Sequence, residues 1–375
     1  MSTFQDSIAQ SNVQFPIETV IEPIAGANYS RAVIYIPLSL AATALPGVDS
    51  PAAGNMVVLK SNNYGVITGG LLKTWLVPFF TKGQTAVVGA AIYDDGDGAE
   101  TNILSDVYEK SKMYGYFKFG YQTDASKYSA LQVALCNLCA ADTLYSRLWV
   151  GTYDSNVLSK TSALFTALKA ASGTFRLIYN PDTDINPALA QLGSTLSKVN
   201  ATGTPVGNSV DMAGFNTIEA SGSLDEEGNR LNLTATEKAA LDDQKIGYDT
   251  WVGDGTENVL TEGSLYANGD SVGAEWVKAY ITYMCKVRVA NLMSRMNVFR
   301  NNGTYQAILL ILQDVVKGFT DFGRLAEFTI TAPAFKDLPK SGDVITVPDA
   351  WSARYIDDVR EVNVYGTLYI TMPTR

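Results

Sequence analysis

The amino-acid sequence predicts a mixed α/β fold in two parts, a βαβ domain followed by a smaller α+β domain. Two observations predict it. Between residues 31 and 200 short apolar runs alternate with stretches of helical length, and after residue 272 a long helical pattern precedes several strands. Strands that alternate with helices indicate βαβ units and a largely parallel sheet. With 375 residues, 46% of them hydrophobic and 18% charged, the chain can bury two such cores.

The first part spans residues 25–200. Its predicted strands are residues 32–38, 85–93, 115–121, 147–152 and 174–179, and its predicted helices are residues 126–141, 156–171 and 185–199. Pro187 supports the last helix, because a proline in the first helical turn has no hydrogen bond to lose.

Residues 201–271 have a different composition, rich in Gly, Asn, Thr and Asp. They predict hairpins and loops around one short helix at 235–242. Thirteen acidic and three basic side chains lie between Glu219 and Glu275, so this segment has a net charge of −10, equal to that of the whole chain. We therefore treat it as a separate acidic region.

Residues 272–360 begin with the strongest helical pattern in the chain. Apolar and aromatic residues recur at spacings of three and four from 272 to 299, and Gly303 is expected to end this helix before a second one at 304–317. Strands are predicted at 327–331, 344–347 and 361–371. Helices followed by strands indicate an α+β domain.

The first of these helices carries basic residues with no acid among them: Lys278, Lys286, Arg288, Arg295 and Arg300. At about 100° per residue they cover roughly half of the helix circumference. Two interpretations remain open. One is a solvated face that pairs with the acidic region of the same chain, and the other is a positive strip that faces an acidic partner.

Both ends of the chain have the alternating pattern of an amphipathic strand. Residues 1–24 form an N-terminal arm and residues 361–375 a C-terminal arm. The apolar positions are Val13, Phe15, Ile17 and Ile21 in the first arm and Val362, Val364, Leu368 and Ile370 in the second. Pro16 has no N–H to donate, which predicts an edge position for the first strand. Such a strand either docks on its own domain or adds to a sheet of a neighbouring chain, and the pattern leaves both open.

The sequence offers little chemistry for catalysis, and we expect no enzymatic activity, no cofactor and no metal. It has no histidine, the commonest general base and metal ligand. Cys136 and Cys139 form a CxxC in the middle of a predicted helix, where core packing explains them, because a zinc site needs further ligands and a redox pair needs a helix N-terminus. The loop with Asp94, Asp95 and Asp97 lacks the ligand spacing of a calcium loop, so a solvated loop explains it better than a cation site.

Charge and hydropathy also bound the partners and the compartment. A chain of net charge −10 repels phosphate backbones, so we expect no nucleic-acid partner. No apolar run approaches the length of a membrane span, and residues 1–10 lack the basic flank and apolar core of a signal peptide. We expect a protein made in a cytoplasm, without direct membrane insertion.

From residue 272 onward the order of elements resembles that of the tail sheath proteins of contractile phage tails and of the related bacteriocin and secretion sheaths. The matching elements are the helix GAEWVKAYITYMCKVRVANLMSRM, the helix NNGTYQAILLILQDVVKGF, the segment DVITVP and the terminal strand VNVYGTLYI. Gly366 and Thr367 are similar to a Gly-Thr pair that these families carry in their end strand. The N-terminal α/β part fits the family only in kind.

The resemblance implies a tail-sheath-like fold, with the α/β domain facing out and the α+β domain facing an inner tube. It implies that copies of the chain form hexameric rings, stacked helically around a tail tube, and that contraction drives the tube through a target envelope. It also implies that the arms add strands to sheets in neighbouring subunits, an arrangement in which Pro16 removes one donor. The five basic residues would meet an acidic tube surface or a neighbour's acidic 219–275 segment.

The partners implied by the resemblance are further copies of the chain, the tail tube protein, and baseplate and tail terminator proteins. The implied location is the tail sheath of a bacteriophage virion, made in the host cytoplasm and used in genome ejection. Two other functions fit less well. A receptor- or carbohydrate-binding tail or baseplate protein would use exposed aromatics, for which 20 Tyr are available, but it is usually β-rich or helical. An enzyme that used Asp94, Asp95 and Asp97 would need a further acid, and the sequence offers none in a supporting pattern.

Overall fold

The computed structural model divides the chain into two units. It describes residues 13–14, 29, 31–45, 51–67, 70–82, 87–96, 100–122, 129–142, 144–181, 186–198, 233–251, 259–262, 266–295, 301–321, 325–338, 344–355 and 363–371. One unit consists of residues 27–201 and 210–272, and the other of residues 1–26, 202–209 and 273–375. We call the first the α/β unit and the second the C-terminal unit.

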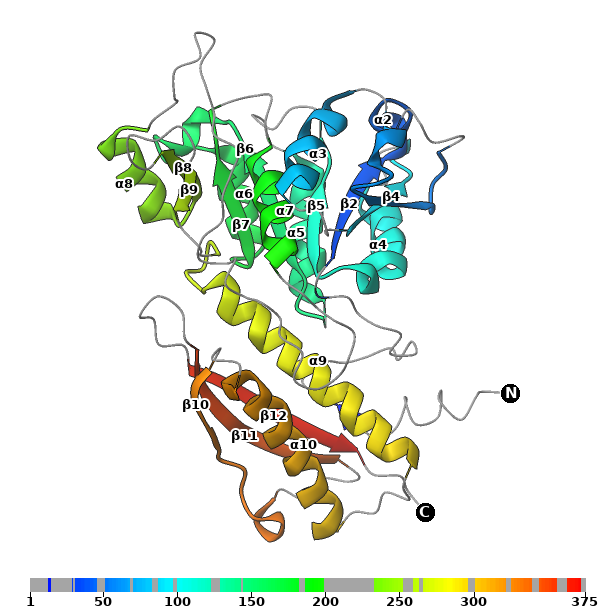
Figure 1. Cartoon of the computed structure of the whole chain (residues 1–375), viewed down its shortest axis with the longest axis vertical. Coiled ribbons are helices and arrows are strands. Elements are labelled where there is room, and N and C mark those ends of the chain that lie inside the picture. Colours follow the sequence, from blue (N-terminus) through cyan, green and yellow to red (C-terminus); the bar gives the residue numbers. More distant parts are fainter. Residues whose placement is uncertain are drawn as a thin grey trace. The chain divides into compact units, whose positions relative to one another are not determined.

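The α/β unit is built on an eight-stranded sheet in the order β3-β4-β2-β5-β6-β7-β8-β9 (Figure 1). The strands are β2 (Ala32–Pro37), β3 (Met56–Lys60), β4 (Val87–Tyr93), β5 (Phe117–Gly120), β6 (Arg147–Thr152), β7 (Phe175–Tyr179), β8 (Gly247–Trp251) and β9 (Val259–Glu262). The strands from β4 to β8 in this order run parallel, and the edge strands β3 and β9 pair antiparallel. The central strands β2, β5, β6 and β7 are buried along their whole length, as parallel strands covered on both faces must be.

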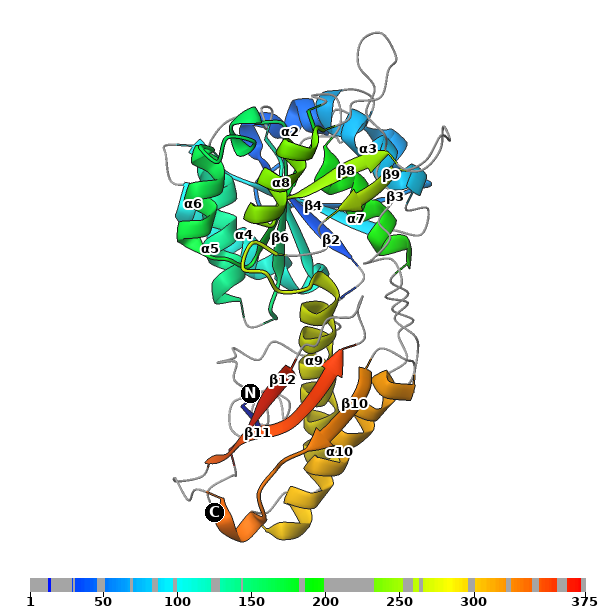
Figure 2. The ribbon, with the colours of Figure 1, turned by 90° about the vertical axis from the view of Figure 1, so that its left-hand side faces the viewer.

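Helices cover both faces of this sheet (Figure 2). They are α2 (Leu38–Ala44), α3 (Gly70–Lys82), α4 (Glu100–Ser111), α5 (Ala130–Ala141), α6 (Ala163–Ala171), α7 (Pro187–Lys198) and α8 (Ala235–Gln244). Helices α4, α5 and α6 lie together on one face, and α3 and α7 lie together on the other. Leu104, Leu135 and Leu168, one from each of α4, α5 and α6, are completely buried in the core against the first face.

The packing of α3 against α7 depends on a glycine. A Cβ on Gly193 of α7 would lie 2.2 Å from the carbonyl oxygen of Phe79 in α3 and 2.7 Å from its Cα. These distances are far below normal contact, and the obstructing atoms belong to the backbone, which cannot rotate away as a side chain does. Gly193 therefore sets how closely the two helices approach.

Most elements of the α/β unit confirm the sequence predictions. The five predicted strands and three predicted helices are all present, and Pro187 lies in the first turn of α7 as expected. The helix expected from 156 begins only at Ala163, because a 3-10 turn at Ser155–Val157, capped by Asp154, precedes it. The strand β3 and the helices α3 and α4 were not predicted from the sequence.

The acidic region contains a hairpin, as predicted, because its successive strands β8 and β9 pair antiparallel. Its described part contributes β8 and β9 to the same sheet, so it belongs to the α/β unit. The sequence of β8 (GYDTW) has no apolar run, which is why the pattern did not locate its bounds or its pairing with β7. The predicted short helix is present as α8, and a capping box of Thr234 and Glu237 starts it.

The C-terminal unit is an antiparallel sheet with helices packed beside it. The strand order is β1-β12-β11-β10, with β1 (Val13–Gln14), β10 (Leu325–Ile330), β11 (Val344–Tyr355) and β12 (Asn363–Thr371). Helix α10 (Asn302–Asp321) lies along the sheet next to β10, and α9 (Val272–Arg295) packs against α10 (Figures 1 and 2). The buried side of α10 consists of Tyr305, Ile308, Leu312, Val315 and Val316, at helical spacing.

Two boundaries in the C-terminal unit differ from the sequence predictions. Gly303 does not end a helix but lies in the first turn of α10, where the side-chain oxygen of Asn301 accepts a hydrogen bond from the N–H of Thr304 (2.9 Å). The strand expected at 344–347 continues to Tyr355 as β11, with an irregularity between Val347 and Trp351. A proline in that interval, at position 348, cannot donate to the ladder, and a bulge accommodates it.

We predict that Gly193→Ala lowers the free energy of unfolding of the α/β unit by about 1–3 kcal/mol, because the added methyl group overpacks the α3–α7 contact. Gly318→Ala is the matched control, since Gly318 also lies within a helix but no atom comes within 4 Å of its would-be Cβ. There alanine should stabilise the helix by about 0.5–1 kcal/mol. Thermal unfolding followed by circular dichroism measures both changes. A Gly193→Ala variant as stable as the parent would show that α3 and α7 can separate without cost.

Candidate functional site

The two terminal strands, the main functional prediction from the sequence, lie next to each other in the C-terminal unit. Strand β12 pairs antiparallel with both β11 and β1, and Val13 lies opposite Ile370. In the single chain both strands therefore dock on their own unit, one of the two arrangements that the pattern left open. The arm positions Val13, Val364, Leu368 and Ile370 lie in these strands, and Phe15, Ile17, Ile21 and Val362 lie outside the described residues.

The register places apolar positions from four strands on one face of the sheet. Val364 lies opposite Ala353, which in turn lies opposite Phe328. Ile370 lies opposite Val13 at the other end of β12. Alternate positions of a strand share a face, so all five positions belong to the same face of the sheet. The alternation seen in the sequence of the C-terminal arm thus corresponds to one face of a folded sheet.

Lys278 and Arg288, members of the basic set predicted from the sequence, make ion pairs within the C-terminal unit. Lys278 pairs with Glu275, one turn away, at 3.4 Å. Arg288 pairs with Asp314 of α10, and its side chain is only 14% exposed. The other three are Lys286, which is partly buried, Arg295, the last residue of α9, and Arg300, outside the described residues.

Aromatic side chains hold α9 against α10. Trp276 and Tyr280 stack with their ring centroids 5.0 Å apart, and Tyr280 meets Phe319 of α10 edge-to-face at 5.7 Å. Trp276 is completely buried. The Arg288–Asp314 pair lies at the same junction between the helices, so the basic face of α9 helps to fix α10.

A groove runs between α10 and β10. Its volume is about 450 Å³, and the residues that line it are Gln306, Leu309, Leu310, Gln313, Phe328, Thr329 and Ile330. Leu310 is 63% exposed, more than any other large hydrophobic side chain in the described part of the chain. Among the described strands β10 pairs with β11 alone, so one edge of β10 borders the groove. The groove combines an apolar surface, two side-chain amides and a strand edge.

Sequence reasoning missed this groove and the partner of Arg288. Asp314 lies within a predicted helix, but nothing in the sequence pairs it with a residue 26 positions away. A signal for the groove was present. Five successive aliphatic residues, 308–312, exceed the apolar stripe that one buried helix face needs, so part of the run had to remain outside the core.

The residues considered for chemistry have structural environments. Cys136 and Cys139 are completely or almost completely buried, and burial raises the pKa of each thiol to about 12, so both stay protonated. Their predicted core packing is confirmed. Partial burial opposes the charge of Asp95, but hydrogen bonds from the hydroxyl and N–H of Ser39 outweigh it and lower the pKa of Asp95. Asp94 accepts a hydrogen bond from the N–H of Gly96 (2.9 Å).

Asp97, the third member of that loop, lies outside the described residues. Within the described ranges no three His, Cys, Asp or Glu side chains are placed to hold a metal ion. In the same part of the chain no helix has the length and apolar character to cross a membrane.

A buried polar cluster in the α/β unit surrounds Lys118 of β5. The ammonium group of Lys118 donates to the carbonyl oxygens of Lys112 (2.8 Å) and Gly115, and it lies 5.5 Å from the ring centroid of Tyr108. The Tyr108 hydroxyl donates to Asp142 (2.9 Å). Lys118 is completely buried, and this burial lowers its pKa to about 8.

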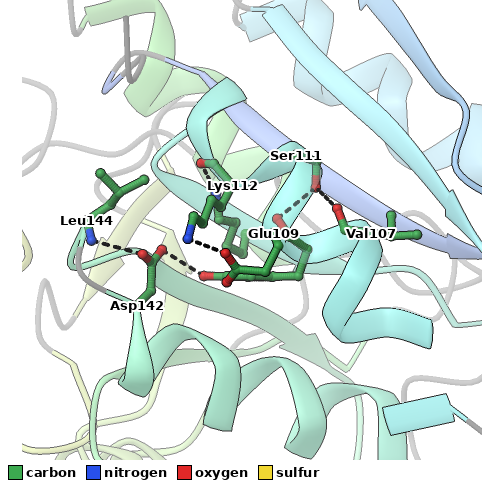
Figure 3. Close-up of polar contacts among 8 residues, drawn as sticks. Val107, Glu109, Ser111, Lys112, Asp142 and Leu144 are labelled. Carbon is green, nitrogen blue, oxygen red and sulfur yellow. Dashed lines mark hydrogen bonds and ion pairs between the residues drawn. The ribbon is translucent and has the colours of Figure 1, made fainter. Parts of the chain in front are cut away.

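Figure 3 shows the polar contacts around this cluster. Asp142 also accepts from the N–H of Leu144 (2.9 Å), and the Ser111 hydroxyl donates to the carbonyl of Val107 (2.7 Å). Asp142 follows the end of α5 and Ser111 ends α4, so the cluster lies toward the amino ends of the parallel strands. Ligands of open α/β sheets bind beyond the opposite, carboxyl ends. The cluster therefore has the position of a structural support rather than of a ligand site.

Comparisons with known proteins give a match at the level of fold. No protein-family model matches the sequence, and no curated protein matches it. The crystal structure of a sheath tail protein from Listeria innocua is similar, with a TM-score of 0.53 and 9% sequence identity, over 92% of this chain and 96% of that chain. The predicted mixed α/β fold of the tail-sheath type is thereby confirmed.

We predict that Arg288→Glu lowers the melting temperature of the C-terminal unit, because it removes the pair with Asp314 and places two acids together. Asp314 is 59% exposed, so the loss is small, about 0.5–1 kcal/mol. The double variant Arg288→Glu with Asp314→Arg restores opposite charges and should regain most of it. Lys317→Glu, which breaks the exposed pair with Asp321, is the control and should have almost no effect. A double variant no better than Arg288→Glu would show that the pair contributes nothing.

We also predict a specific pH dependence from Lys118. Its pKa is about 8 in the folded state and has an ordinary value of 10.5, so the unfolded state binds more protons between these values. The contribution of Lys118 to stability is therefore least favourable below pH 8 and improves as the pH rises toward 10.5. Relative to Lys118→Met, the parent chain should gain about 2 kcal/mol between pH 7 and 9.5.

Urea unfolding at a series of pH values measures this difference. Comparing the parent with Lys118→Met cancels the titration of the other groups, since both chains share them. Lys110→Met, at an exposed surface position, should leave the pH dependence unchanged. Parallel stability profiles for the parent and Lys118→Met would show that Lys118 keeps its ordinary pKa.

Proposed function

We propose that this chain is a structural subunit of a contractile tail sheath and has no catalytic activity. The observation that carries the proposal is the fold, which is similar to that of a sheath tail protein over 92% of this chain and 96% of the other. The sequence resemblance of residues 272–375 supports it separately, because that resemblance rests on the order and pattern of elements rather than on superposition. In this role the protein belongs to the tail of a virion.

In the proposed assembly, copies form hexameric rings stacked helically around a tail tube, with baseplate and terminator proteins at the ends. The contacts are head-to-tail, since contacts of this type generate rings and helices rather than closed dimers. Contraction takes the subunits from one packing to another of lower free energy, and the difference drives the tube into the target.

Exchange of the terminal strands connects the subunits in this proposal. The support is the way β12 is held, through backbone pairing with β11 on one side and β1 on the other. An identical strand from a neighbour makes the same contacts, so exchange replaces interactions without losing them. Each backbone hydrogen bond contributes about 0.5–1.5 kcal/mol and each buried apolar side chain about 1.5–3 kcal/mol, against the entropy of ordering the arm.

The basic residues of α9 have a more limited role in the proposed contact with the tube than the sequence resemblance implied. Lys278 and Arg288 already have acidic partners in the same unit. Partly exposed ion pairs are weak, so an acidic tube surface would compete with Glu275 and Asp314 for these cations. Weak contacts of this kind suit a surface that must slide during contraction.

We expect the full-length chain, expressed alone and concentrated, to form hollow helical tubes or stacked six-fold rings. Negative-stain electron microscopy is the measurement. A closed, compact trimer would contradict the sheath proposal and favour a receptor- or carbohydrate-binding tail protein. A chain that stays monomeric even on isolated tail tubes would contradict it as well.

We expect deletion of residues 362–375 to abolish these assemblies, because it removes β12. The α/β unit should remain folded, since none of its described strands pairs with β12. Circular dichroism checks folding and sedimentation velocity checks assembly. Deletion of residues 372–375, which leaves β12 intact, is the control and should still assemble. Tubes formed by the longer deletion would show that the C-terminal arm does not connect the subunits.

A further inference from the structure

Asn63 folds back onto the free edge of the sheet in the α/β unit. Strand β3 ends that sheet and, among the described strands, pairs with β4 alone. The chain turns after Lys60, and the turn places Asn63 beside the strand that precedes it. An uncovered strand edge presents backbone N–H and C=O groups on which another strand can pair. The contacts of Asn63 therefore bear on whether this edge can accept one.

Alternate residues of β3 direct their backbone groups toward the free edge. The carbonyl oxygen of Asn55, just before β3, accepts from the N–H of Ile92 in β4 (2.9 Å), so the odd-numbered positions face β4. The even-numbered positions, among them Val58 and Lys60, therefore face outward. The side-chain amide of Asn63 donates to the carbonyl oxygen of Val58 (3.0 Å) and accepts from the N–H of Lys60 (2.6 Å). The backbone N–H of Asn63 donates to the carbonyl oxygen of Lys60 (3.1 Å).

The carboxamide of Asn63 thus takes the place of a neighbouring strand. A side-chain amide has an acceptor oxygen and N–H donors, the same kinds of group that a peptide unit offers. Its bonds to Val58 and Lys60 occupy one acceptor and one donor that an added antiparallel strand would use. Another strand can pair at these positions only if the Asn63 side chain moves away.

An aromatic contact holds the turn in this position. Tyr64 follows Asn63 and begins the 3-10 turn Tyr64–Val66, and its ring stacks on that of Phe80 in α3 with the ring centroids 4.7 Å apart. Phe80 is buried in the core of the α/β unit. Stacked aromatic pairs stabilise a contact beyond the area that they bury. The core thus fixes the residue next to Asn63, which limits how far Asn63 can move from the edge.

The edge that Asn63 covers is apolar. The sequence of β3 is MVVLK, with two β-branched residues of the kind that strands favour. Met56 is 38% exposed, and it is one of three large hydrophobic side chains that are exposed in the described part of the chain. Two copies of this edge can pair antiparallel about a two-fold axis, with Val58 opposite Val58 and Met56 opposite Lys60 of the other copy. That pairing needs the carbonyl oxygen of Val58, which Asn63 occupies.

We infer that the side chain of Asn63 closes the free edge of β3 against pairing with the β3 strand of a second copy of this chain. This role is independent of the proposed sheath function, because it concerns a contact that Asn63 prevents in the α/β unit. Removing the Asn63 amide opens the edge, and the sheets of two copies then join through their β3 strands into one continuous sheet.

Disulfide cross-linking of the full-length chain tests the inference. Val58→Cys is introduced into every variant, and the samples are oxidised at a concentration below that at which larger assemblies form. Directly opposed, hydrogen-bonded residues of antiparallel strands have their Cα atoms about 5.5 Å apart, within the range that a disulfide spans. The native Cys136, Cys139 and Cys285 are at most 3% exposed and do not compete.

We expect at least about ten times more cross-linked dimer when Asn63→Ala is added to the Val58→Cys chain, because the edge is then open. Asn62→Ala is the matched control, since Asn62 is an exposed asparagine of the same turn, and it should leave the amount of dimer unchanged. Adding Met56→Lys to the Asn63→Ala chain should reduce the dimer about tenfold, because it places a lysine opposite Lys60 of the other copy. Circular dichroism at the assay temperature checks that each variant is folded.

Two results would overturn the closing role of Asn63. The first is an equal amount of dimer with and without Asn63→Ala, or an increase with Asn62→Ala as large as with Asn63→Ala. The second is a dimer that Met56→Lys does not reduce, because it would arise from another surface or from an unfolded chain. Both results would leave the sheath proposal standing, since electron microscopy of the unmodified chain tests that proposal separately.

Discussion

Backbone pairing between β11 and β12 is the interaction on which the C-terminal unit depends. It joins the last described segment of the chain to the sheet, and through β12 it also brings β1 into the sheet. Ladder hydrogen bonds do not depend on which chain supplies the strand, whereas the register does depend on the apolar positions, since a slip of one residue would turn them to the other face. The same interaction can therefore hold a single chain together or connect two chains.

The edge strands of the two sheets have different surroundings. In the α/β unit, parallel strands are buried between helices, and the short antiparallel strands β3 and β9 end the sheet on either side. In the C-terminal unit, the edge of β10 lies beside an apolar groove with the exposed Leu310. Edges that are left accessible attract further strands.

Buried cations in the central strands show how the α/β unit accommodates charge. Lys118 bonds to backbone carbonyls, and Arg176 lies 5.0 Å from the ring centroid of Trp149 and donates to Gln191 (3.0 Å). Carbonyl oxygens, an amide oxygen and aromatic rings thus stabilise these buried cations. Such an arrangement holds neighbouring strands and helices in one packing, because each cation depends on partners from several elements.

The sequence by itself determined the elements with a strong local pattern. The apolar runs of β2, β4, β6 and β7 predicted buried parallel strands, and the spacing of apolar residues predicted α5, α7, α9 and α10. Buried parallel strands consist of continuous apolar residues, and helices repeat every 3.6 residues, so both are visible without knowledge of the rest of the chain. The core role of Cys136 and Cys139 followed in the same way from a position in the middle of a helix.

Only the tertiary structure decided the features that depend on residues far apart in the sequence. It paired Arg288 with Asp314, so this residue of the basic face of α9 has an acidic partner in its own unit. It placed the antiparallel strands β8 and β9 at one end of the eight-stranded sheet, and it brought α10 and β10 together to form the groove. The alternation of the terminal strands predicted that they pair, but not with what, because the partner of a strand is fixed by long-range contacts that no local pattern contains.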